Sequence, residues 1–124
     1  MKPRTFLIVV AVVAFLYGLG LLLAPALMES SYGTESTASV MLSDRYFGST
    51  LLAVAVIAWL GKDLAGASVR PIITGCLIGF AAGLVVSVIG TLDGTMNASG
   101  WSAVVLYLLL TLGCAYFQFA ARPN

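Results

Sequence analysis

The sequence contains no histidine among its 124 residues. The chain therefore offers no imidazole to ligate haem, a chlorin pigment or zinc, and no histidine general base. It also lacks a glycine-rich phosphate loop followed by lysine, a serine nucleophile elbow and a C-x-x-C pair. These absences predict that the chain has no catalytic residues, no metal site and no cofactor, and they favour a non-enzymatic role.

Charged residues are scarce as well. They make up 9% of the chain, whereas an ordinary soluble domain carries roughly 25%. Apolar residues make up 60%, and the mean hydropathy is +1.05. The net charge of +1 leaves no basic stripe to neutralise phosphates, which excludes nucleic acid as a partner.

Four long apolar runs, separated by short polar stretches, fill most of the chain. Crossing a membrane takes about 20 mostly apolar residues per helix, so four crossings leave little chain for anything else. The pattern predicts an all-α fold: an integral membrane up-down four-helix bundle that forms a single domain over residues 1–124. The helices are expected at about residues 5–28, 40–60, 71–92 and 101–121.

The basic residues predict the orientation, because lysine and arginine are retained on the cytoplasmic side during insertion. With four crossings, five of the six lie on one side of the membrane: Lys2, Arg4, Lys62, Arg70 and Arg122. Both termini are therefore expected to be cytoplasmic, in a bacterial inner membrane.

A cleaved signal peptide is a competing interpretation of the first apolar run. Ala24-Pro25-Ala26 fits the small-x-small cleavage pattern of such a signal. The run is longer than the apolar core of a typical signal, which favours a retained membrane helix.

A row of small residues marks the third run. Gly75, Gly79 and Gly83 recur every four residues, and Ser87 continues the row. Small residues let membrane helices approach closely, which supplies much of their association in lipid. The row is expected either to pack against another helix of this chain or to dock a second copy or another membrane subunit.

Arg45 is the sixth basic residue and lies near the outer end of the second run. A guanidinium is costly in hydrocarbon, so it is expected to pair or to reach the headgroups. Asp93 is its expected partner, and Tyr46 and Asp44 complete a candidate outer polar cluster. The cluster is either a structural clamp or headgroup anchor, or a site for an anionic ligand or a quinone-type carbonyl.

Two cysteines and two tyrosines lie within the apolar runs. Cys76 and Cys114 are expected at similar depths, and buried cysteines commonly act as small apolar fillers; the sequence does not decide whether they touch. Tyr17 and Tyr107 are expected near mid-membrane, where each hydroxyl needs a hydrogen-bond partner.

Two short motifs carry a resemblance to a known group. Leu23-Ala24-Pro25 ends the first run, and Arg45-Tyr46-Phe47-Gly48-Ser49 opens the second. In this order the chain resembles small bacterial four-helix membrane proteins of unknown function with a DoxX-like layout. The resemblance implies a four-helix bundle and carries over no catalytic residue.

The small share of chain outside the apolar runs favours a non-catalytic function. The expected role is an accessory or scaffolding subunit of a bacterial inner-membrane complex or homo-oligomer. Its partners would be membrane lipids and other membrane subunits, or copies of itself bound through the helices. The alternative is a protein that binds or transports a lipid, quinone or isoprenoid in a pocket near the outer leaflet.

Overall fold

The computed structural model describes residues 2–64 and 66–120, all in helices and the turns between them. Four helices are long and apolar enough to span a membrane, as predicted. The elements in chain order are α1 Pro3–Leu23, α2 Pro25–Ser31, α3 Ala38–Gly61, the 3-10 turn η1 Gly66–Val69, α4 Arg70–Leu92, α5 Gly100–Ala115 and the π-helical turn η2 Tyr116–Ala120. Arg122 and the last residue of the predicted fourth helix, Ala121, lie outside the described residues.

The first apolar run is divided, where one helix over 5–28 was predicted. Ala24 separates α1 from α2 and adopts φ −139° and ψ 57°, which is not helical. The cause is Pro25, because proline disfavours the helical conformation of the residue before it and donates no hydrogen bond. The apolar run therefore turns at Pro25 into the short helix α2.

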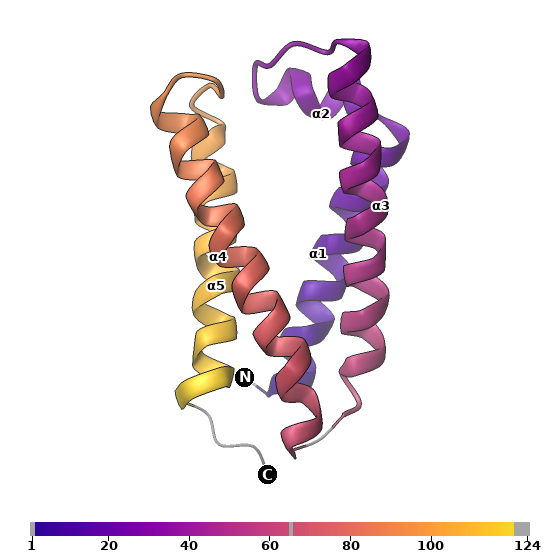
Figure 1. Cartoon of the computed structure of the whole chain (residues 1–124), viewed down its shortest axis with the longest axis vertical. Helices are drawn as coiled ribbons and strands as arrows, with labels where there is room; N and C mark the ends of the chain where they lie inside the picture. The colour runs from indigo at the N-terminus through magenta and orange to yellow at the C-terminus, as the bar shows by residue number, and fades with distance from the viewer. Residues whose placement is uncertain (1, 65, 121–124) are drawn as a thin grey trace.

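The long helices form two antiparallel hairpins, α1 with α3 and α4 with α5 (Figure 1). The hairpins meet at the end of the bundle where α1 begins, and they diverge toward the end that carries α2. The described core lies where they meet, and its central buried members are Leu7, Val10, Ile73 and Cys114. The rings of Phe6 and Phe117 join the hairpins there, with centroids 5.3 Å apart.

Glycine sets the crossing of α1 and α3. A Cβ atom on Gly48 would lie 2.7 Å from the carbonyl oxygen of Gly18, and one on Gly18 would lie 3.0 Å from that of Gly48. The two backbones are thus in direct contact, which only glycine permits. The pair lies fifteen residues before and after Gly33, a turn residue with φ +72°.

Candidate functional site

The predicted glycine row of α4 does not act as one surface. Gly83 packs inside the α4–α5 hairpin, where an added Cβ would fall only 2.4 Å from Cε1 of Tyr107. Ser87 is buried on the same side, at 5% exposure. By contrast, nothing lies within 4 Å of a Cβ built on Gly75 or Gly79, and both residues are exposed. The row drifts around the helix because four residues exceed one turn of 3.6.

The outward face of α4 is therefore shallow in its first half. Gly75 and Gly79 lie on it with Ala82, which is also exposed. Ile78 and Val86 rise beside them, at 67% and 68% exposure. We call Gly75, Gly79 and Ala82 with these two flanking residues the outward α4 face. It offers bare backbone bordered by branched side chains to whatever lies beside the helix in the membrane.

The expected ion pair between Arg45 and Asp93 is wrong. Arg45 is exposed and forms no salt bridge with any residue in the part of the chain that the structure describes. Asp93 is instead next to Thr95, whose side-chain hydroxyl and backbone N–H, the latter at 2.9 Å, lower the pKa of the Asp93 carboxyl. The pair fails because α3 packs on α1 and α4 on α5, so the outer ends of α3 and α4 diverge (Figure 1).

Tyr46 and Asp44 face different sides of α3. Tyr46 is 68% exposed on the outside of α3, a position that suits a ring at the membrane boundary. Asp44 faces inward, and its carboxyl lies near the Glu29 carboxyl of α2. Thr34 donates a hydrogen bond to Glu29 as well, while Oδ2 of Asp44 is buried without a partner among the described residues. Two carboxyls thus share one polar site, where an arginine and a carboxylate were expected.

Three half-buried tyrosines lie on the inner sides of the diverging hairpins. Tyr17 of α1 lies near Tyr32, which follows α2. Tyr32 also lies near Tyr107 of α5, and its carbonyl accepts a hydrogen bond of 2.9 Å from the N–H of Asn97. Tyr32 therefore brings a third tyrosine close to Tyr17 and Tyr107, from a loop that the sequence analysis did not consider.

A charged cluster forms at the opposite end of the α1–α3 hairpin. Asp63 accepts from Nζ of Lys62 at 3.1 Å and from Nε of Arg4 at 3.3 Å, and these bonds lower the pKa of its carboxyl. Nζ of Lys62 also lies 4.1 Å from the ring centroid of Trp59 and donates to the Trp59 carbonyl at 3.1 Å. The sequence analysis used Lys62 and Arg4 for orientation alone. Arg4 and Asp63 lie 29 and 30 residues from Gly33 in the sequence, and this near-equal spacing is the signal that would have predicted their ion pair.

The cysteines occupy the core as apolar fillers. Cys114 is fully buried, and Cys76 packs against the same cluster close to it. Both thiols are free. Their similar depth was anticipated, and packing of α4 on α5 brings them together.

The chemistry of these groups is limited. Among residues 2–64 and 66–120, no three His, Cys, Asp or Glu side chains gather where they would hold a metal ion. The Glu29 and Asp44 carboxyls lie near each other, and the three tyrosine hydroxyls can donate and accept hydrogen bonds. Comparisons with protein-family models, with curated proteins and with solved structures find no match to this chain, so the DoxX-like resemblance stays an expectation based on two short motifs.

Proposed function

We propose that this protein is a non-catalytic accessory or scaffolding subunit of a bacterial inner-membrane complex or homo-oligomer. It associates laterally with its partner through the outward α4 face. The observation that carries the proposal is the open space over Gly75 and Gly79, which contrasts with the packed Gly83 one turn further on.

The energetic cost of exposed glycine in a helix supports this assignment. Glycine within a helix is about 1 kcal/mol less favourable than alanine, so a bare glycine on a lipid-facing surface brings only a penalty. A partner helix offsets that penalty, because two backbones that approach closely gain dispersion contacts and weak Cα–H···O contacts. Inside this chain, Gly18 and Gly48 show the same principle at the α1–α3 crossing. The outward α4 face offers an equivalent surface with no helix from residues 2–64 or 66–120 packed on Gly75 and Gly79.

The test is native mass spectrometry of tagged protein, gently extracted from its own membranes. The wild type is expected to retain a partner, or another copy, at fixed stoichiometry. Gly79→Leu should abolish this association while the monomer keeps its helical content and is at least as stable as the wild type, because the new side chain enters open space and leucine favours the helix. Val105→Leu is the matched control, since Val105 is exposed on α5, outside the outward α4 face. Retained assembly in a folded Gly79→Leu variant would contradict the proposal.

A second candidate is binding or transport of a small lipid-soluble molecule, such as a quinone or isoprenoid, near the outer leaflet. The observation that favours it is the convergence of Tyr17, Tyr32 and Tyr107 where the hairpins diverge, close to α2. Ionisable and polar groups in a membrane helix bundle commonly mark a ligand path. The hydroxyls would bind carbonyl or hydroxyl oxygens of such a molecule.

The two candidate functions predict complexes of different mass in native mass spectrometry. A site among the tyrosines predicts one small molecule retained by a single chain, and its loss in Tyr17→Phe with the assembly unchanged. A ligand-free chain that retains subunits would exclude the second candidate.

A further inference from the structure

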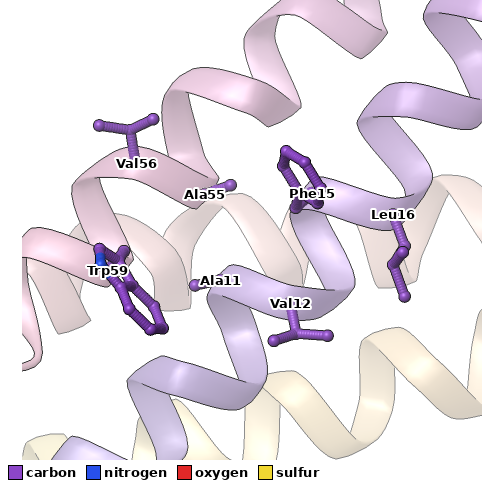
Figure 2. Close-up of a pocket in the computed structure, with 7 residues that line it drawn as sticks. All are labelled: Ala11, Val12, Phe15, Leu16, Ala55, Val56 and Trp59. Atoms are coloured by element: carbon purple, nitrogen blue, oxygen red, sulfur yellow. The ribbon is translucent and has the colours of Figure 1, made fainter.

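An apolar groove runs between α1 and α3 on the outside of the bundle, with a volume of about 340 Å³ (Figure 2). Ala11 and Ala55 are almost fully buried and form its floor. Figure 2 shows Phe15 of α1 and Trp59 of α3 on either side of these alanines, each about half exposed. The groove is thus a recess one side chain deep in the lipid-facing surface.

The groove leads toward the charged cluster at the start of α1. Trp59 carries the Lys62 ammonium against its ring, and Arg4 lies beside Asp63. Arg4 uses only Nε in that contact, so its two terminal nitrogens have no partner in the described residues. Lys2 is exposed two residues earlier. Two cations, Arg4 and Lys62, therefore share one carboxylate at this end of the groove.

We propose that the α1–α3 groove holds one acyl chain of an anionic phospholipid, whose phosphate binds Arg4 at the end of the groove. The spacing fits such a ligand. Arg4 precedes Leu16, the far lining residue, by twelve positions, which is about 18 Å along a helix. One leaflet of the hydrocarbon core is about 15 Å thick, so a phosphate at Arg4 places its acyl chain along the whole groove.

Charge complementarity selects the anionic headgroup. A guanidinium binds phosphate oxygens with two parallel hydrogen bonds, and basic residues beside membrane helices attract anionic lipids. Arg70 also lies at this end of the bundle, but it donates to the carbonyl of Gln118 at 2.7 Å and belongs to the other hairpin. It therefore provides a matched charge outside the proposed site.

The experiment uses the full chain in mixed micelles with phosphatidylglycerol and phosphatidylcholine of identical acyl chains, followed by native mass spectrometry. The wild type should retain one phosphatidylglycerol in preference to phosphatidylcholine. Arg4→Gln should weaken that retention roughly fivefold, the factor for one lost surface charge. Asp63→Asn should strengthen it by a similar factor, because the competing carboxylate is gone. Arg70→Gln should change it less than twofold.

The opposite signs separate lipid binding from a structural role. Arg4→Gln and Asp63→Asn both break the same ion pair, so a purely structural pair predicts the same change in both variants. A groove variant gives a second, independent readout: Ala55→Leu fills the floor and should lower retention of both lipids, whereas Ala53→Leu, exposed on the same helix, should not. Equal retention of the two lipids by the wild type, changes of the same sign in the two charge variants, or a second copy seated on the groove would overturn the proposal.

Discussion

Replacing Gly83 and Gly79 with alanine compares a packed position with an open one on the same helix. A Cβ on Gly83 would lie 2.4 Å from Cε1 of Tyr107 and 2.7 Å from both Cδ1 and Cζ, whereas ordinary contacts begin near 3.4 Å. The whole ring must therefore move by about 1 Å. Overpacking of this kind costs about 1–3 kcal/mol. A Cβ on Gly79 meets nothing within 4 Å.

The pairing of the two variants removes the largest confounding effect. Each variant gains the same helix propensity of about 1 kcal/mol from alanine, so the difference between them isolates the contact with Tyr107. Gly83→Ala is therefore expected to be less stable than Gly79→Ala by about 1–3 kcal/mol.

The assay is reversible unfolding in mixed micelles with increasing mole fraction of sodium dodecyl sulfate, followed by circular dichroism. Repeating Gly83→Ala in a Tyr107→Leu background measures the coupling free energy between the two positions. The loss of stability from Gly83→Ala should be much smaller in that background, because the flexible leucine can move aside. Equal stabilities of Gly79→Ala and Gly83→Ala, or no coupling to Tyr107, would refute the packing described for α4 and α5.

Three further predictions concern the hairpins and the polar groups. Gly48→Ala should lower the free energy of unfolding by about 3 kcal/mol in the same assay, because the carbonyl of Gly18 belongs to the backbone and cannot rotate away. An unchanged stability would mean that α1 and α3 lie further apart than described. Asp44→Asn should raise the melting temperature at neutral pH, since the amide can donate to the facing Glu29 carboxyl, and a lower melting temperature would contradict the carboxyl pair. Phe117→Ala should lower the free energy of unfolding by less than the about 3–5 kcal/mol typical of a water-soluble core. The reason is that an apolar side chain that leaves the core enters lipid, not water. Phe119→Ala is the control and should leave stability unchanged, because Phe119 is 77% exposed.

Hydropathy predicts the helices well because the bilayer acts on each run separately. The second and third predicted spans, 40–60 and 71–92, lie within two residues of α3 and α4 at every end. The break at Ala24 was missed because apolar content continues through Pro25 into α2, and only the local effect of proline on the preceding residue reveals it.

Lateral arrangement is much harder to infer. The sequence predicts that Arg45 and Asp93 lie toward the same end of the bundle, but a shared end does not specify which helices are neighbours. Glycine spacing also fails to identify the neighbouring helix. Gly75, Gly79 and Gly83 are evenly spaced in the sequence, but Gly75 and Gly79 face open space while Gly83 packs against Tyr107 inside the α4–α5 hairpin. Positions at equal distance from a turn carry more information, because they face each other in an antiparallel hairpin, as Gly18 and Gly48 do.

The ring contact between Phe6 and Phe117 has a consequence for biosynthesis. These residues are 111 positions apart, yet they help to close the core at the junction of the hairpins. Each hairpin buries its own crossing through local contacts and can insert into the bilayer as a pair of helices during translation. The core cannot close until Phe117 has been synthesised, so the two hairpins complete their docking late in the folding of the chain.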